Sequence, residues 1–431
     1  MLLNVIRVLV CFMVALVVCQ SGAGKVQADI DNVKKVRIVW EVQPDAVMYE
    51  LMIVKQPADT AEQSALPEPI LIRQDIYTAG VELDALALNS ELNSLWWQVR
   101  ALNVERQPIS EFSQPQLLSE GEINPISPLP TAYLDSFPFG KLYPAYSWIP
   151  VLNAASYEVQ VLSAKPEIDQ VYVALVRKYE VSGSVAFDCY DEAAYTEEGT
   201  YWWRVLAKDA DNKPIGQWSP ALSFQVQRQG VPIALFGDSV THGGGAISNP
   251  PSDPAYDLTS YAGLPIKNLG RSGDTVAGMV DRFDHDVLPF SPQVLVVLGG
   301  INDIRAGMSA DEVIEYFAAI KSQCLRHGIV PVFVTLTPVN PTAIKNAFDE
   351  ETSPEWRSQW EQANQWIIAQ EHHVDVTPLF NQPGGLMPTA LATDGLHPDT
   401  VGKAMIGSAV GAYLKQNFPE HTNQAAQWQE I

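Results

Sequence analysis

The chain has 431 residues, more than one ordinary hydrophobic core supports, so two or three domains are expected. Hydrophobic residues make up 47% of the sequence and charged residues 18%, a composition that excludes an intrinsically disordered protein. The formal net charge is −23 at pH 7. Because such an acidic surface repels phosphate groups, we expect no nucleic-acid partner and no binding to anionic membranes.

The N-terminal segment has the order of a secretory signal. Arg7 precedes an apolar run over residues 8–18 that is too short to span a bilayer comfortably, and small residues follow. We therefore expect residues 1–28 to be a signal peptide, with no transmembrane segment after its removal and a mature protein that is secreted or held in the cell envelope. Lipid anchoring at Cys19 is an alternative that Val18 disfavours, because such sites usually carry Gly, Ala or Ser there.

Two of the four cysteines lie in this expected signal peptide. The other two, Cys189 and Cys324, fall in different predicted domains. The cysteine pattern therefore indicates neither a disulfide framework nor a metal cluster.

A tandem repeat precedes residue 229. "WEVQPDAVMYELMIV" from Trp40 is similar to "WIPVLNAASYEVQVL" from Trp148, and "LWWQVRALNVERQPISEFSQP" from Leu95 is similar to "YWWRVLAKDADNKPIGQWSP" from Tyr201. Apolar residues alternate with polar ones inside each copy, and turn residues separate the runs. This pattern predicts two antiparallel β-sandwich modules.

The early Trp, the "YWWRV" strand and the closing "WSP" resemble a fibronectin type III module, less closely in the first copy, where Phe112 replaces Trp218. The resemblance implies fibronectin type III-like modules at residues 29–118 and 143–228. Residues 119–142 form a Pro-rich linker that we expect to be stiff and extended.

Each module contains a pair of adjacent tryptophans, Trp96–Trp97 and Trp202–Trp203. Adjacent strand residues point to opposite faces, so at most one of each pair fills a core and the other covers the outer face or meets a ligand. Packing is the favoured interpretation. No His occurs between Asp29 and Arg228, which excludes a His-based catalytic or metal site in the modules.

From residue 229 onward, apolar strand patterns alternate with helical patterns, as in a doubly wound parallel sheet. In such a sheet, chemistry collects at the carboxyl ends of the strands. Strands are predicted near residues 232–236, 265–269, 293–298, 329–336 and 374–377, and helices near residues 276–288, 309–327, 354–371 and 400–417.

Ser239, in "GDS", follows the first of these strands directly. An Asp or Ser at this place commonly caps the next helix, whereas a nucleophilic serine requires a base and a group that orients the base. "TDGLHP" supplies both in Asp394 and His397, three residues apart before the last helix. Acyl transfer also requires oxyanion donors, and Gly270 and Asn302 lie at the ends of the second and third strands. Gly270 could equally be a turn residue, and Asn302 a helix cap.

"GDS", Gly270 in "NLGRSG", "GIND" and "DGLHP" resemble the four sequence blocks of the SGNH, or GDSL, hydrolases. The resemblance implies a flavodoxin-like α/β/α three-layer domain over residues 229–417, followed by a polar tail at 418–431. It further implies that Ser239 is the nucleophile, His397 the general base and Asp394 its orienting group. The Gly270 N–H, the Asn302 side-chain N–H and the Ser239 N–H would form the oxyanion hole.

Several neighbouring residues have less definite roles. An α/β-hydrolase is disfavoured because Thr241 stands at the final Gly position of G-x-S-x-G. His242 has no evident carboxylate partner and is interpreted as a pocket wall or a substrate contact. Arg271 could meet an anionic substrate group or form a surface salt bridge, and the Gly/Pro-rich loop at residues 243–257 could form a lid.

These patterns predict an exported serine esterase that needs no metal and no organic cofactor. Its expected partner is an acyl ester substrate, with O-acetyl groups on a polysaccharide as the candidate by analogy. One alternative is a lysophospholipase or thioesterase, and another is a non-catalytic surface binding protein. Because every candidate site residue follows Gly230, we also expect the hydrolase domain to fold and act alone.

Overall fold

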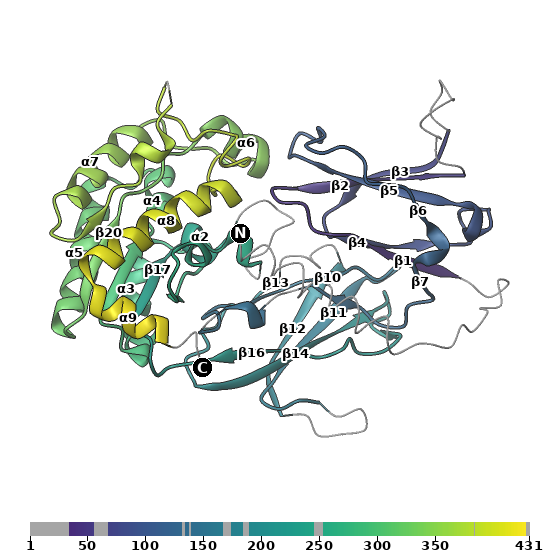
Figure 1. Cartoon of the computed structure of the whole chain (residues 1–431), viewed down its shortest axis with the longest axis horizontal. Helices are drawn as coiled ribbons and strands as arrows, with labels where there is room; N and C mark the ends of the chain where they lie inside the picture. The colour runs from purple at the N-terminus through teal and green to yellow at the C-terminus, as the bar shows by residue number, and fades with distance from the viewer. Residues whose placement is uncertain are drawn as a thin grey trace.

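The computed structural model describes residues 34–55, 68–131, 134–137, 139–166, 174–183, 189–244, 253–382 and 384–427. The expected signal peptide and most of the Gly/Pro-rich loop lie outside these ranges. Figure 1 shows antiparallel sheets in the N-terminal half, residues 34–228, beside a helix-covered sheet in the C-terminal half, residues 229–427. Among the described residues, no helix combines the length and the apolar character needed to cross a membrane.

The first β unit contains two antiparallel sheets with one shared hydrophobic cluster. Its elements are β1 (Lys35–Val39), β2 (Met48–Val54), β3 (Pro69–Ile76), β4 (Gly80–Asp84), η2 (Leu92–Ser94), β5 (Trp96–Leu102), β6 (Gln116–Leu117), η3 (Leu118–Glu120) and β7 (Glu122–Ile123). The strand orders are β4-β1-β7 and β3-β2-β5-β6. Tyr49, Leu51 and Ile53 alternate along β2 and are all buried with side chains of β1 and β4. The antiparallel strands predicted from the alternation are confirmed.

The second β unit is built around a five-stranded antiparallel sheet, β12-β11-β14-β15, in which β16 also pairs with β14. Two short pairs, β9 with β13 and β8 with β10, complete it. Its elements are β8 (Leu129–Pro130), η4 (Leu134–Ser136), β9 (Ala145–Tyr146), β10 (Trp148–Ile149), β11 (Ser156–Leu162), β12 (Leu175–Ser182), β13 (Cys189–Tyr190), β14 (Gly199–Lys208), β15 (Pro214–Ile215) and β16 (Leu222–Val226).

The paired tryptophans divide between the two faces of their strands. Trp97 and Trp203 are buried, whereas Trp96 and Trp202 are only partly buried. The Lys165 ammonium lies 5.3 Å from the centre of the Trp202 ring. One tryptophan of each pair therefore packs in a core, as expected.

The segment predicted to be an extended linker, residues 119–142, instead pairs with both β units. β7 joins β1 in the first unit, and β8 joins β10 in the second. The two-residue strands are too short to give an alternation pattern, and Pro130 lies in a two-stranded pair where a missing N–H is tolerated. The local sequence therefore gave no signal of these distant partners.

The C-terminal half contains a five-stranded sheet in the order β18-β17-β19-β20-β21, with all pairs parallel. In sequence order this is 2-1-3-4-5, the flavodoxin-like arrangement. The strands are β17 (Ile233–Gly237), β18 (Lys267–Asn268), β19 (Val294–Leu298), β20 (Val330–Val334) and β21 (His373–Val374). β17 and β19 are completely buried, so their runs are apolar without alternation. The predicted parallel sheet is confirmed.

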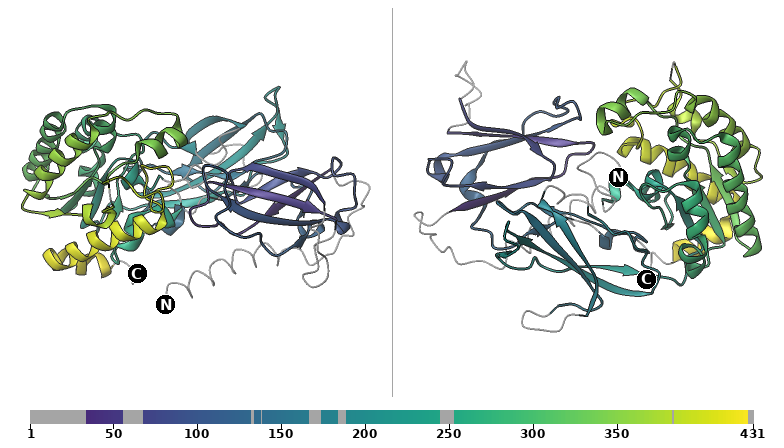
Figure 2. Two further views of the ribbon diagram at one scale, coloured as in Figure 1. Left: turned by 90° about the horizontal axis from the view of Figure 1, so that it is seen from above. Right: turned by 180° about the vertical axis from the view of Figure 1, so that it is seen from behind.

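Helices cover both faces of this sheet, and Figure 2 shows α8 and α9 lying together at one side of the half. The helices are α2 (Ser239–His242), η6 (Pro254–Tyr256), η7 (Leu258–Tyr261), α3 (Val276–Asp286), η8 (Leu288–Phe290), α4 (Ile301–Ala306), α5 (Ala310–Arg326), α6 (Pro341–Phe348), α7 (Trp356–Ile368), η9 (Thr377–Phe380), α8 (Thr400–Asn417) and α9 (Pro419–Gln427). The four long predicted helices are confirmed as α3, α5, α7 and α8. Short α2, α4 and α6 were not predicted, and the expected polar tail contains α9.

The second β unit and the C-terminal half share one hydrophobic cluster, whereas the first β unit has its own. Residues 139–143, which we call the strap, run from the β unit against β18. The buried Lys267 ammonium donates to the carbonyls of Phe139 and Gly140 at 2.7 and 3.1 Å. Burial lowers the pKa of Lys267 to about 7. The strap therefore satisfies a buried polar group of the parallel sheet.

We now expect the folding of the C-terminal half to depend on the strap. The sequence had led us to expect that this half folds alone. A chain beginning at Gln227 would lack the acceptors of Lys267 and would expose the apolar surface that the C-terminal half buries against the second β unit. Exposing such a surface costs several kcal/mol of a total stability of about 5–15 kcal/mol. Thermal unfolding followed by circular dichroism should show no cooperative native-like transition for this chain.

The matched control begins at residue 125, so that it keeps the strap and the second β unit and loses only the unit with a separate core. This longer chain should unfold cooperatively. A native-like transition in the chain from Gln227 would show that the strap is dispensable.

Candidate active site

Ser239 lies at the first position of α2, directly after β17. The capping role at this turn belongs to Asp238, whose buried carboxylate accepts hydrogen bonds from the N–H groups of Val240 at 3.0 Å and Gly300 at 3.1 Å. The Ser239 hydroxyl instead donates to His397 Nε2 at 2.8 Å. The capping and nucleophile interpretations of "GDS" therefore apply to different residues.

His397 connects Ser239 to Asp394. Its Nδ1–H donates to Asp394 Oδ2 at 2.8 Å, and the N–H groups of Leu396 and His397 donate to Asp394 Oδ1, both at 2.8 Å. Gly395 has φ +76, which lets the loop turn back so that its own amides reach the carboxylate. With one oxygen fixed by the loop and the other by the imidazole, Asp394 sets both the tautomer and the direction of the ring.

The three predicted oxyanion donors are not equally available. The Asn302 amide is fixed at both ends, since Nδ2 donates to the Asp274 carbonyl at 3.0 Å and Oδ1 accepts from Arg305 Nε at 3.3 Å. Nδ2 keeps a second N–H, and Asn302 lines the same cavity as Ser239. The Gly270 N–H, by contrast, donates to Asn268 Oδ1 at 2.9 Å.

The structure gives a steric reason for glycine at position 270. A Cβ there would lie 2.4 Å from the backbone nitrogen of His242, so any side chain would collide with α2. Glycine is therefore required because the second strand end packs directly against the helix that carries Ser239.

The last three carbonyls of α2 have side-chain donors in place of a following helical turn. Lys403 donates to the Val240 carbonyl, Asn268 Nδ2 to the Thr241 carbonyl at 2.7 Å, and Lys141 to the His242 carbonyl at 2.5 Å. Both lysines are buried, and burial lowers the pKa of Lys403 to about 8. Lys141 belongs to the strap, so the N-terminal half helps to hold the Ser239 helix.

Lys141 also forms a buried ion pair with Asp257 at 2.7 Å. Burial by itself would raise the pKa of Asp257, but the Lys141 ammonium and hydrogen bonds from Thr259 hold it below its usual value. Two opposite charges are therefore enclosed between the strap and the catalytic half.

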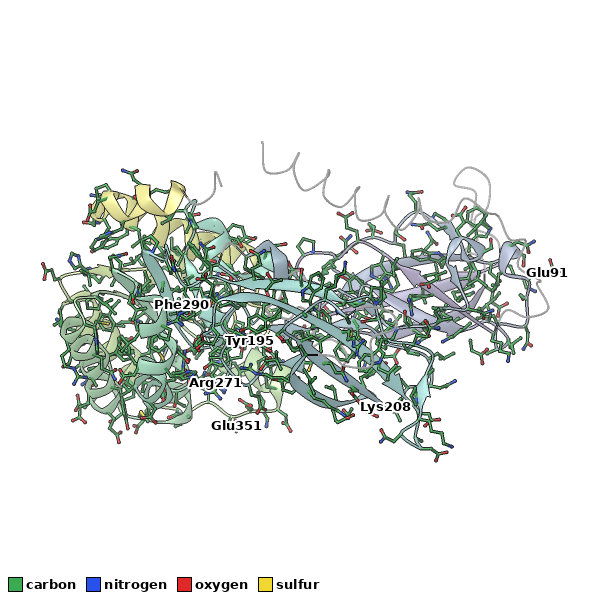
Figure 3. The ribbon with its side chains drawn as sticks, turned by 90° about the horizontal axis from the view of Figure 1, so that it is seen from below. Glu91, Tyr195, Lys208, Arg271, Phe290 and Glu351 are labelled. Carbon is green, nitrogen blue, oxygen red and sulfur yellow. The ribbon has the colours of Figure 1, made fainter. Side chains whose placement is uncertain are left out.

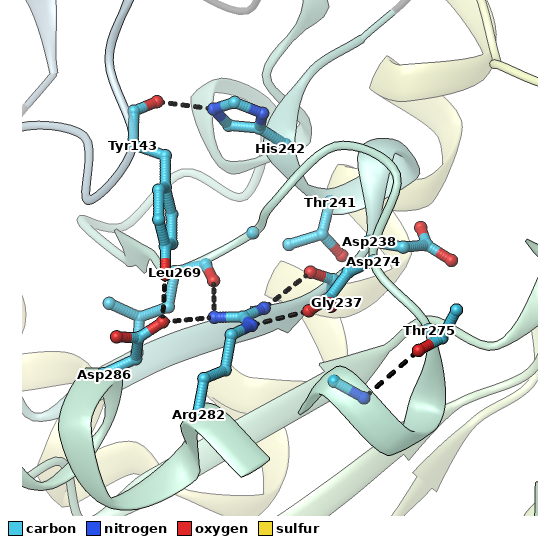
Figure 4. Close-up of polar contacts among 12 residues, drawn as sticks. Tyr143, Gly237, Asp238, Thr241, His242, Leu269, Asp274, Thr275, Arg282 and Asp286 are labelled. Carbon is cyan, nitrogen blue, oxygen red and sulfur yellow. Dashed lines mark hydrogen bonds and ion pairs between the residues drawn. The ribbon is translucent and has the colours of Figure 1, made fainter. Parts of the chain in front are cut away.

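Tyr143 fastens the end of the strap to the pocket. Figure 4 shows its carbonyl bonded to His242 and its hydroxyl bonded to Asp286. The hydroxyl donates to Asp286 Oδ2 at 2.6 Å, and Arg282 bonds the same oxygen at 2.9 Å. Arg282 also bonds the carboxylate of Asp274. One network of buried charges thus connects the strap to the segment after β18.

His242 is part of the pocket wall, as one of the two sequence interpretations proposed. Its Nε2–H donates to the Tyr143 carbonyl at 2.6 Å, while Nδ1 accepts from the N–H of Ser272 at 3.2 Å and lies 2.8 Å from the Ser272 hydroxyl. Burial, assisted by the Lys141 charge, lowers the pKa of His242 to about 3. A neutral ring with both nitrogens occupied is a structural group.

A cavity of about 640 Å³ opens at the Ser239 hydroxyl, and residues of both halves line it. The C-terminal half contributes Ser239, His242, Gly244, Arg271, Ser272, Gly273, Asn302, Arg305, Phe348, Glu350, Leu396 and His397. The N-terminal half contributes Tyr143, Tyr190, Asp191 and Glu192. Figure 3 labels Arg271 close to the junction of the halves. The sequence offered no signal for the N-terminal group, since it lacks any catalytic motif.

Across the described ranges, no three His, Cys, Asp or Glu side chains gather in a way that could hold a metal ion. Cys189 and Cys324 are free and buried, and they lie in different halves.

A serine bonded to a carboxylate-oriented histidine at the switch point of a parallel sheet is an arrangement that serine hydrolases use. Residues 235–405 match the model of the GDSL-like Lipase/Acylhydrolase family. This range is therefore a GDSL-like lipase/acylhydrolase domain, and the protein is a serine hydrolase that acts on ester bonds. Comparison with curated protein sequences gives no match.

Solved structures with similar folds include a putative acylhydrolase from Bacteroides fragilis, with 17% identity, a TM-score of 0.37, and coverage of 44% of this chain and 89% of that chain. Another is the lipase/acylhydrolase from Enterococcus faecalis, with 22% identity, a TM-score of 0.35, and coverage of 43% and 95% respectively. At these identities and scores, the family assignment depends on the sequence match.

Replacing Lys141 should test the buried pair beneath the Ser239 helix. Lys141→Met leaves the Asp257 carboxylate buried and unpaired, so we expect the free energy of unfolding to fall by about 3–5 kcal/mol in urea titrations. The double variant Lys141→Met, Asp257→Asn removes both charges and should recover part of this loss.

The control is Lys213→Met, because the Lys213 side chain is 73% exposed and its pair with Asp211 lies at the surface. It should change the free energy of unfolding by less than about 0.5 kcal/mol. An equally small change in the free energy of unfolding of Lys141→Met would show that the buried Lys141–Asp257 pair does not stabilise the fold.

Proposed function

We propose that the protein is an exported serine esterase that uses Ser239, His397 and Asp394 as a catalytic triad. The observation that carries this proposal is the continuous chain of 2.8 Å hydrogen bonds from the Ser239 hydroxyl through His397 to Asp394. An intact chain of this kind also argues against a binding protein with a vestigial catalytic domain.

In the proposed reaction, His397 Nε2 takes the proton of Ser239 as Oγ attacks the acyl carbon of the ester. Asp394 keeps Nδ1 protonated and stabilises the imidazolium that forms. The imidazolium then gives its proton to the leaving alcohol, which breaks the ester bond and leaves an acyl-serine. Water, deprotonated by the same nitrogen, releases the acid and restores Ser239.

We propose the free N–H of Asn302 Nδ2 and the N–H of Ser239, at the start of α2, as the first oxyanion donors. The Gly270 N–H could join them only by giving up its bond to Asn268. A donor held by two fixed bonds, as Asn302 is, needs little reorganisation when negative charge develops on the substrate oxygen.

The cavity favours a short acyl group on a polar alcohol, and we propose O-acetyl groups on carbohydrate as the substrate. Of the described residues that line the cavity, only Phe348 and Leu396 have wholly apolar side chains, while five side chains carry charge. Apart from these two and the rings of Tyr143 and Tyr190, a long acyl chain would meet polar or charged groups. The lysophospholipase or thioesterase alternative therefore has less support.

We further propose that residues 1–28 direct export and that the two β units are fibronectin type III-like modules. The sequence repeat and the antiparallel sheets support the second proposal.

Removing either reacting group should abolish turnover. Ser239→Ala and His397→Ala should each lower kcat for ethyl acetate by roughly 10⁴-fold or more, measured by acid release at constant pH. The control is Ser260→Ala, an exposed serine in the same half, which should keep native activity. Retention of more than about a tenth of native activity by Ser239→Ala would rule out this nucleophile.

Asn302→Ala tests the proposed oxyanion donor. Because the interaction is made mainly in the transition state, kcat should fall by roughly 10²–10³-fold with little change in KM. A matching circular dichroism melting curve would show that the fold is preserved. A change in KM alone would assign Asn302 to substrate binding.

A further inference from the structure

The loop after β13 brings the second β unit into the active-site cavity. Tyr190, Asp191 and Glu192 all line it together with Ser239. β13 pairs with β9, just beyond the strap, and the N–H of Asp191 donates to the Pro144 carbonyl at 2.8 Å. Because the strap is fixed to the catalytic half, this loop has a defined place opposite the catalytic residues.

Asp191 anchors the loop. Its carboxylate accepts hydrogen bonds from the Tyr146 hydroxyl at 3.0 Å and the Ala193 N–H at 3.1 Å, and it pairs with Arg177 at 2.9 Å. The Asp191 side chain is fully buried, whereas the neighbouring Glu192 is exposed. Because Asp191 is fixed, it keeps its neighbours Tyr190 and Glu192 at the cavity.

The charged groups of the cavity fall into two classes. Asp191 pairs with Arg177, and Arg305 pairs with Glu350 at 2.6 Å. The side chains of Glu192 and Arg271 are exposed and make no hydrogen bond or ion pair with any residue that the structure describes. Two charges of opposite sign therefore remain available to a ligand.

Aromatic rings lie beside these charges. The Arg271 guanidinium carbon is 5.6 Å from the centre of the Tyr143 ring, so Tyr143 supports its position. The Tyr190 ring lies 5.8 Å from the His242 ring, at an interplanar angle of 51°. The cavity thus combines an aromatic surface, a carboxylate acceptor and a guanidinium donor.

We propose that Tyr190, Glu192 and Arg271 form the subsite for the alcohol part of the ester, and that this part is a hydroxyl-rich, sugar-like group. The proposal rests on the esterase function proposed above and names the groups that select its substrate. A sugar ring offers an apolar C–H face to Tyr190, hydroxyl donors to Glu192 and hydroxyl acceptors to Arg271. Hydrogen bonds to charged groups are the stronger ones, so each contact should contribute to binding.

The test compares two acetyl esters that differ only in the alcohol, ethyl acetate and a mono-O-acetylated hexose, with the full chain. Tyr190→Ala, Glu192→Gln and Arg271→Gln should each lower kcat/KM for the acetylated hexose by about tenfold. On ethyl acetate, which is too small to reach the subsite, the same variants should stay within about twofold of the native protein. Glu197→Gln, a surface carboxylate outside the cavity, is the matched control and should change neither value.

Equal losses on both esters would overturn the proposal, because the residues would then act on the Ser239 site itself. Unchanged kcat/KM for the acetylated hexose in all three variants would also overturn it. A long-chain lysolipid ester serves as a third substrate, and a loss of kcat/KM confined to that ester would overturn the proposal as well. A native protein that hydrolyses neither acetyl ester would contradict the proposed esterase function instead, so the two failures are distinguishable.

Discussion

The side-chain hydrogen bonds to the carbonyls of α2 are the interactions on which the rest of the site depends. A four-residue helix cannot satisfy its own carbonyls, and Lys141, Asn268 and Lys403 donate to them instead. These donors come from the strap, from β18 and from α8, so the position of Ser239 is determined by three distant segments. A buried donor that is lost leaves an acceptor without a partner, which links the stability of the fold to the position of Ser239.

This arrangement changes the role of the N-terminal half. A module that only tethers an enzyme to a polymer needs no buried contacts with the catalytic domain. Here the strap supplies the partner of Asp257, and the loop after β13 supplies one wall of the cavity. The second β unit therefore shares the hydrophobic core of the C-terminal half and lines the cavity at Ser239, whereas the first has a separate core. Its contact with the catalytic half includes Asp45, which accepts from the N–H of Thr400 at 3.0 Å.

The sequence predicted the parallel sheet and the four long helices, because runs of apolar residues mark buried strands and a helical period marks helices. The grouping of Ser239, Asp394 and His397 was implied by the resemblance of "GDS" and "DGLHP" to blocks of the SGNH hydrolases. It did not predict the strap, because Lys141 and Asp257 are more than a hundred positions apart and a lysine normally indicates an exposed position. It also gave no sign that position 270 must lack a side chain to make room for the backbone of α2. Contacts between distant segments leave no local pattern.

The most direct measurement for the central claim is the mapping of a fluorophosphonate adduct by peptide mass spectrometry on the full chain. A serine whose proton is taken by an oriented histidine reacts with such a reagent, and other serines do not. The account predicts one adduct, on Ser239, and a strong loss of labelling in His397→Ala. An adduct on another serine, or labelling of Ser239 that is unaffected by His397→Ala, would contradict it.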